Sequence, residues 1–178
     1  MATHGLHITR NSSFALHGFT DTDWVGSIDD RKSTGGYLVF FGQTLISWKS
    51  GKQCTVARSS TEAEYKALAD GTVEVIWLQY LLTDLQIPSI SAPIIWCDNL
   101  GATYLSTNPI FHARTKHVEV DYLFVRDSVV KKKIQISFIS SHDQLADAFT
   151  KPLLTASFTV FRFKLRVDPP PSVWGGIL

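Results

Sequence analysis

The chain has 178 residues, of which 44% are hydrophobic and 19% are charged, with 17 Lys and Arg against 16 Asp and Glu. That length suits a single domain, and the hydrophobic share excludes wholesale disorder. The formal net charge of +1 excludes a basic field over the whole molecule, so any contact with nucleic acid depends on a local patch.

Three β-rich segments come first, over residues 14–21, 36–41 and 44–48. Gly42 and Gln43 separate the last two segments, and a two-residue connection that begins with Gly is typical of a tight hairpin. These segments predict a three-stranded antiparallel meander.

A long helix is predicted next. Ser59 and Glu62 form a capping box, and the helical pattern then continues to about Leu85. The remaining predicted elements are a strand at 94–98, helices at 99–106 and 115–130, a strand at 134–140, a short helix through Thr150 opened by a second capping box of Ser141 and Gln144, and a helix at 157–166.

Strands that precede helices in this order predict a mixed α/β sheet with helices packed on it. We expect one domain over residues 1–166. The Pro-rich residues 167–178 cannot join a helix or a central strand, so a flexible tail is expected there.

The lengths of the apolar runs and the number of cysteines indicate where in the cell the protein is expected. No apolar run approaches the roughly 18 residues that a membrane helix needs, and the N-terminus lacks the apolar stretch of a secretory signal. Cys54 and Cys97 are too few for a disulfide framework, and both are expected to be buried thiols in a reducing compartment. We therefore expect an intracellular protein, cytoplasmic or nuclear, without membrane contact.

Glu64 lies on the stripe of the long helix that is predicted to face the sheet. At about 100° per residue, the apolar positions that follow fall within roughly 40° of Glu64, whereas Glu62 lies about 160° away. We therefore expect Glu62, Asp70 and Asp84 to be exposed. A core-facing carboxylate needs a cation or hydrogen bonds, unless the helix dipole and residual water stabilise it in the first turns.

Other acids stand near predicted strand ends. Asp98 ends the apolar strand IIWCD, where ligands commonly bind, although Asp98 or Asn99 could instead cap the next helix. Asp21 and Asp23 share one face of the first strand, and spacing cannot choose between them; a solvated strand end is the alternative. Asp147 lies on the short predicted helix that ends at Thr150, and its position on that helix alone predicts a solvated acid. Several converging carboxylates would suit Mg²⁺ ions.

The motifs FTDTDW, SSTEAEY, IIWCDN and QLADAFTK occur in this order. From about Gly5 to Leu165, the chain resembles the ribonuclease H domain of copia-type (pseudoviral) long-terminal-repeat retrotransposon polyproteins, the C-terminal part of their reverse transcriptase. The resemblance implies a ribonuclease H-like α/β fold, with a five-stranded mixed sheet in the order 3-2-1-4-5 flanked by helices.

The resemblance also implies that Asp21, Glu64, Asp98 and Asp147 are catalytic and bind two Mg²⁺ ions, with Mn²⁺ as a substitute. The carboxylates of the first three are then expected within about 8 Å of one another, the reach of a two-metal cluster. The implied activity is hydrolysis of the RNA strand of RNA–DNA hybrids, and the implied protein partner is a reverse transcriptase polymerase domain in the parent polyprotein.

Two other functions remain alternatives. A catalytically weak or inert remnant, which at most binds nucleic acid, is suggested because the chain lacks a Tyr-x-Asp-Asp polymerase motif. A transposase or integrase fits less well, because those enzymes usually carry three main acids at other spacings. Leu123 stands where many ribonuclease H relatives carry a histidine, and His142, five residues before Asp147, is assigned no catalytic role.

A local basic and polar surface is expected to hold the hybrid, with a solvated face as the alternative. A second basic run, Lys131 to Lys133, is more simply explained as a solvated face. The residues of the first surface flank the meander and the start of the long helix: Arg31, Lys32, Lys49, Lys52, Gln53 and Arg58.

Overall fold

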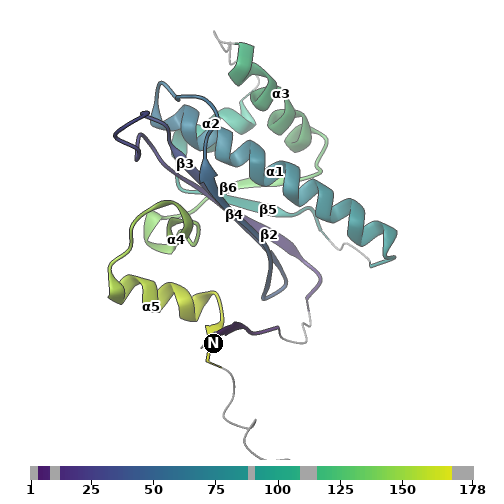
Figure 1. Cartoon of the computed structure of the whole chain (residues 1–178). Helices are drawn as coiled ribbons and strands as arrows, with labels where there is room; N and C mark the ends of the chain where they lie inside the picture. Colours follow the sequence, from purple (N-terminus) through teal and green to yellow (C-terminus); the bar gives the residue numbers. More distant parts are fainter. Residues whose placement is uncertain (1–3, 9–12, 88–90, 109–115, 170–178) are drawn as a thin grey trace, which may run out of the picture.

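The computed structural model describes residues 4–8, 13–87, 91–108 and 116–169. A five-stranded sheet forms its centre, with helices on both faces (Figure 1). The sheet strands are β2 (Leu16–Asp23), β3 (Thr34–Phe41), β4 (Thr44–Lys52), β5 (Ile94–Cys97) and β6 (Gln135–Phe138). The helices are α1 (Ser60–Asp84), α2 (Leu100–Thr107), α3 (Lys116–Val130), α4 (Asp147–Thr150) and α5 (Thr155–Lys164), with a 3₁₀ turn at Ser141–Asp143.

The sheet order is β4-β3-β2-β5-β6, which confirms the predicted order 3-2-1-4-5. β2, β3 and β4 are antiparallel, whereas β5 runs parallel to β2 and to β6. Gly42 has a φ of 59°, a left-handed conformation that glycine adopts without steric cost, so the hairpin between β3 and β4 turns as predicted. The predicted meander and mixed sheet are therefore confirmed.

Each face of the sheet has its own apolar core. The first helix, α1, packs across one face with α2 and α3 beside it, while α4 and α5 lie on the other face (Figure 1). Ser59 caps α1, its side chain accepting a hydrogen bond from the Glu62 backbone N–H, as the capping box predicts. The predicted stripe is also confirmed, because Leu68 and Val75 are completely buried.

The predicted helix from Ser141 to Thr150 is wrong, because the segment is split into the 3₁₀ turn and α4. Gln144 interrupts it: the side chain is completely buried, and its Nε2 donates to the Thr20 carbonyl at 2.9 Å. Thr20 on β2 lies 124 residues from Gln144 in the sequence, so no local pattern could predict this contact.

Two further expectations differ from the structure. The first residues of the predicted tail, Val167–Asp168, form a short strand β7 that pairs with β1 (Gly5–Leu6); residues 170–178 lie outside the described residues. Cys54 is exposed, although Cys97 is buried as expected. Among the described helices, none combines the length and apolar character that a membrane crossing requires.

Candidate active site

Asp21 and Asp98 lie close together because the pairing between the parallel strands β2 and β5 ends beside them. The last pair between β2 and β5 joins Thr20 to Cys97; Asp21 is the next residue of β2, and Asp98 directly follows the end of β5. Carboxyl ends of neighbouring parallel strands lie at the same edge, so both side chains enter the same space. Asp21 is completely buried, and Asp98 is half-buried.

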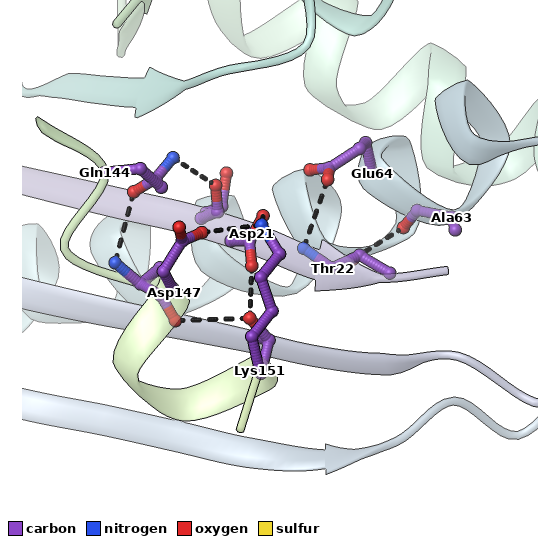
Figure 2. Close-up of polar contacts among 10 residues, drawn as sticks. Asp21, Thr22, Ala63, Glu64, Gln144, Asp147 and Lys151 are labelled. Carbon is purple, nitrogen blue, oxygen red and sulfur yellow. Dashed lines mark hydrogen bonds and ion pairs between the residues drawn. The ribbon is translucent and has the colours of Figure 1, made fainter. Parts of the chain in front are cut away.

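Glu64 reaches the same space from the start of α1. Because β5 ends at Cys97, the backbone N–H of Thr22 has no β5 residue opposite it, and it donates instead to Glu64 Oε1 at 3.2 Å (Figure 2). The Thr22 hydroxyl donates to the Ala63 carbonyl, which holds this end of α1 against β2. The helix stripe predicted from sequence therefore places Glu64 beside the strand ends.

The three carboxylates form one group. Asp21, Glu64 and Asp98 each offer an oxygen, and these oxygens lie within 4.8 Å of one another, inside the distance of about 8 Å expected for these three; Asp147 is not part of this group. Burial, together with the charges of Asp21 and Asp98, raises the pKa of Glu64 to about 9. The carboxylates thus repel one another strongly in the absence of a cation.

One buried oxygen of this group fits a bound cation. Glu64 Oε2 is buried and has no hydrogen-bond partner among the described residues, which is costly unless an ion or water contacts it. Carboxylate oxygens in such a cluster are the ligands that Mg²⁺ and Mn²⁺ prefer. The residues present therefore fit the divalent ion that the resemblance implies.

The structure separates the residues that the sequence left as alternatives. Asn99, and not Asp98, caps α2, since its side chain accepts from the Ala102 backbone N–H at 2.9 Å. Asp98 is therefore available to the carboxylate group. Asp21 belongs to that group, whereas the Asp23 carboxylate lies against Gly26 in the following turn.

Asp147 approaches Asp21 from the other face of the sheet through a shared lysine. Lys151 Nζ donates to Asp147 Oδ1 at 2.7 Å and to Asp21 Oδ1 at 3.1 Å (Figure 2). The Asp147 side chain is only 18% exposed, so it is not the solvated acid that its helix suggests. Burial, opposed by Lys151 and reinforced by Asp21, raises the pKa of Asp147 to about 6.

Sequence reasoning missed three residues that hold this side of the site. Gln144 anchors the segment before α4 to β2, Thr150 Oγ1 donates to Asp21 Oδ2, and Lys151 bridges the two aspartates. The spacing of four between Asp147 and Lys151 is a signal that could have found the ion pair. Nothing local marks the other two.

Glu62 was expected to be exposed, and that expectation is wrong. Its side chain is only 13% exposed, because Oε1 accepts from Lys66 Nζ and Oε2 accepts from the Arg58 backbone N–H. Asp70 and Asp84 are exposed, as expected. Of the three acids that were expected on the solvent side of α1, Glu62 is therefore fixed by contacts with Lys66 and the Arg58 backbone.

The predicted basic surface lies near the end of the sheet that carries the carboxylates. Lys49, Lys52 and Gln53 line a groove of about 340 Å³ between β4 and α1. Lys49 pairs with Asp70 and Lys52 with Asp30. These ion pairs are exposed, so breaking one costs only about 0.2–1 kcal/mol.

The other members of this surface differ in their contacts. The Gln53 amide donates to the Ala63 carbonyl at 2.8 Å, so its nitrogen helps to hold α1. Arg31 and Arg58 are exposed, and Lys32 is half-buried. The second run, Lys131 to Lys133, is exposed and precedes β6, whose first residue pairs with the start of β5, at the opposite end of the sheet from Asp98.

The two positions considered above in connection with a catalytic histidine, His142 and Leu123, are both exposed. His142 lies in the 3₁₀ turn with its side chain 88% exposed, 3.2 Å from Asp143. Leu123 is exposed on α3. Thr115, which begins the TKH segment used to align Leu123, lies outside the described residues.

Comparison with known sequences gives long matches. No protein-family model matches the chain. The chain is 46% identical over 175 residues to the "Retrovirus-related Pol polyprotein from transposon RE2" of Arabidopsis thaliana, a match that covers 98% of the chain and 12% of that polyprotein. It is 42% identical over 136 residues to the Pol polyprotein from transposon TNT 1-94 of Nicotiana tabacum, covering 76% of the chain and 10% of that polyprotein. The chain thus spans about an eighth or less of these relatives.

Comparison with solved structures concerns the fold. The N-terminal RNase H domain of rv2228c from Mycobacterium tuberculosis superposes with a TM-score of 0.57 at 12% identity, covering 83% of this chain and 99% of that chain. LC11-RNase H1, solved in complex with an RNA/DNA hybrid, gives 0.54 at 10% identity, covering 80% and 99%. At such low identities the likeness establishes the fold alone, and it is the fold expected from sequence.

Proposed function

Because the chain is homologous to part of copia-type retrotransposon Pol polyproteins and has the ribonuclease H fold, we propose that it is a metal-dependent endonuclease that hydrolyses the RNA strand of RNA–DNA hybrids. The observation that carries this proposal is the group of Asp21, Glu64 and Asp98, whose oxygens lie within 4.8 Å of one another. The buried, unpartnered Oε2 of Glu64 supports a cation at this group.

The proposed ligands are Asp21, Glu64 and Asp98, with Asp147 completing the set from α4. Two bound Mg²⁺ ions, or Mn²⁺ in their place, would supply a water activated for attack and stabilisation of the leaving 3′-oxygen. The protein would contribute preorganised geometry: Thr22 fixes Glu64 through a backbone hydrogen bond, and Thr150 fixes Asp21. Together these contacts limit how far either carboxylate can move.

Substrate binding is proposed to use the basic surface around the β4–α1 groove. The register places Asp21 opposite Gly36, and Gly36 opposite Ser50, so β4 lies two strands, or about 10 Å, from Asp21. Lysines on β4 would then hold a phosphate backbone while the RNA strand lies at the carboxylates. Contacts to 2′-hydroxyls would distinguish the RNA strand from DNA.

The polyprotein relatives support a proposal about the protein partner, whereas the location remains an expectation from the sequence alone. We expect the partner to be a reverse transcriptase polymerase domain and the location to be intracellular, cytoplasmic or nuclear. The second candidate function is an inert remnant that binds hybrid without cutting it. It is favoured by Leu123, which stands where many ribonuclease H relatives carry a histidine.

Strand-selective cleavage tests the proposal. The purified chain, with Mg²⁺ or Mn²⁺, is incubated with an RNA–DNA hybrid, with single-stranded RNA and with duplex DNA. The expected result is cutting of the RNA strand of the hybrid alone, abolished by a chelator. Hybrid binding without metal-dependent cutting would support the remnant, and equal cutting of single-stranded RNA would contradict hybrid recognition.

A further inference from the structure

Lys151 places a positive charge inside the proposed active site. Its ammonium nitrogen lies 3.1 Å from Asp21 Oδ1 and 2.7 Å from Asp147 Oδ1 (Figure 2). Asp21 is therefore shared between two groupings: the three-carboxylate group with Glu64 and Asp98, and the pair with Asp147 that Lys151 bridges. The QLADAFTK motif thus contributes a cation as well as an acid.

The contacts around Asp21 restrict where that lysine can act. Thr150 Oγ1 donates to Asp21 Oδ2 while Lys151 Nζ donates to Oδ1, so adjacent residues at the end of α4 contact both oxygens of one carboxylate. Asp21 itself is buried and fixed on β2. A cation that binds between Asp21 and Asp147 must therefore share Oδ1 with the ammonium or replace it.

We propose that Lys151 holds the second cation position of the site, between Asp21 and Asp147, and is displaced when a divalent ion binds there. This inference rests on the proposed function, since it concerns the same metal site. The first position, among Asp21, Glu64 and Asp98, binds an ion without displacing Lys151. Lys151 is accordingly a positioning residue that sets the order and relative affinity of the two ions.

The lysine is able to leave. Its side chain is 36% exposed, whereas the side chain of Asp21 is 1% exposed, so the lysine side chain reaches solvent while the aspartate side chain does not. Lys151 is also the C-cap of a helix of only four residues, α4, and Pro152 follows it. Like charges at contact distance repel strongly at a partly buried site, so the ammonium and a divalent ion exclude each other from Asp21 Oδ1.

A wild-type measurement tests this displacement. The ¹⁵Nζ resonance of Lys151, detected through its Hε protons, is followed as Mg²⁺ is added without nucleic acid. The backbone amide of Thr22, which donates to Glu64, reports binding at the first position. Lys131, paired with Asp127 at the same spacing of four but outside the site, is the internal control.

We expect the Thr22 amide to shift first, Lys151 Nζ to shift at higher Mg²⁺, and Lys131 Nζ to stay unchanged. A shift at Thr22 with none at Lys151, up to saturating Mg²⁺, would overturn the inference and leave the proposed function standing. Absence of any shift at either reporter would overturn the metal site together with the inference.

Variants give an independent readout through Mn²⁺ binding, counted by electron paramagnetic resonance. Lys151→Gln removes the charge, so the weaker of the two Mn²⁺ affinities should rise roughly tenfold or more, while Lys151→Arg should stay near wild type. Lys131→Gln is the matched control and should change neither affinity. An unchanged or lower weak affinity in folded Lys151→Gln would contradict displacement.

Discussion

Glu62 and Glu64 lie two residues apart at the start of α1 and meet different surroundings. Both are shielded from solvent, but both oxygens of Glu62 have partners, in Lys66 and in the Arg58 backbone. Glu64 accepts one hydrogen bond, from Thr22, and its second oxygen has no hydrogen-bond partner among the described residues. The two side chains therefore differ in what they can bind and not merely in exposure.

Replacing each glutamate by glutamine separates these roles. Glu64→Gln should abolish hybrid cleavage, because it removes a charge that a divalent ion needs. Glu62→Gln should retain cleavage near the wild-type rate but lose about 1–3 kcal/mol of stability, since it removes the charge from a largely buried ion pair with Lys66. Cleavage rates and urea unfolding of both variants are the measurements; equal loss of cleavage in the two would contradict the assignment.

The buried Glu64 also predicts how stability depends on pH in a chelator. Burial raises its pKa to about 9 from an ordinary value of 4.5, so the folded state holds a proton that the unfolded chain releases. This stabilisation is complete below pH 4.5 and is lost as pH rises toward 9.

Urea unfolding at pH 5 and pH 8 measures that loss. Between pH 5 and pH 8, the free energy of unfolding of wild type should fall by at least about 1 kcal/mol more than that of Glu64→Gln, because each unit of pKa shift corresponds to about 1.4 kcal/mol. Saturating Mg²⁺ should reduce the difference, since the ion stabilises the ionised carboxylate. Parallel pH profiles for the two proteins would contradict the raised pKa.

At the scale of elements, the close approach of α1 to β2 sets the position of Glu64 relative to Asp21. Gly71 permits it: a Cβ at this residue would lie 2.6 Å from Thr20 Cγ2, and Thr20 is completely buried. Any side chain at residue 71 would push the helix away from the strand that carries Asp21.

Gly71→Ala should therefore destabilise the protein by up to about 2 kcal/mol. The steric cost of overpacking, about 1–3 kcal/mol, exceeds the gain of about 1 kcal/mol in helix propensity. Gly51→Ala is the control, because a Cβ there meets nothing within 4 Å. Thermal or urea unfolding compares the two, and a stabilised Gly71→Ala would show that the helix is free to move outward.

The elements show how far local pattern carries a prediction. α1, the hairpin at Gly42 and the sheet order follow from periodicity, turn chemistry and family resemblance, and all are confirmed. The segment 141–150 fails because Gln144 bonds to Thr20, a partner 124 residues away. β1 and β7 have two residues each, too few for any periodic signal.

The site itself was predictable to different degrees. The inward position of Glu64 followed from helix angles alone, whereas Asp147 depended on resemblance, because α4 has only four residues. Spacing could not separate Asp21 from Asp23, since both share one face of β2. The parallel register with β5, which is a property of the assembled sheet, makes that distinction.

At the scale of the whole molecule, the two basic clusters lie at opposite ends of the sheet. Lys49 and Lys52 are on β4 near the carboxylates, and the run from Lys131 to Lys133 precedes β6 at the other end. A hybrid that reaches Asp98 would contact the first cluster and not the second. Net charge, which is +1, cannot supply this selectivity.

Salt dependence of hybrid binding tests which cluster is used. Replacing Lys49 and Lys52 together by alanine should weaken binding and reduce the slope of log affinity against log salt by about one unit for each phosphate that these lysines neutralise. The paired change of Lys131 and Lys132 to alanine should leave the slope as in wild type. A reversed outcome would place the hybrid at the other end of the sheet.

The central claim is that the carboxylates at the carboxyl ends of β2 and β5, with Glu64, form a metal-dependent nuclease centre. The most direct measurement is cleavage of the RNA strand of a hybrid in Mg²⁺ by wild type and by Asp98→Asn. The substitution removes a ligand's charge at nearly constant volume, so we predict cleavage by wild type, none by a folded variant, and hybrid binding by both. Cleavage that survives Asp98→Asn would contradict the claim and place the chemistry elsewhere.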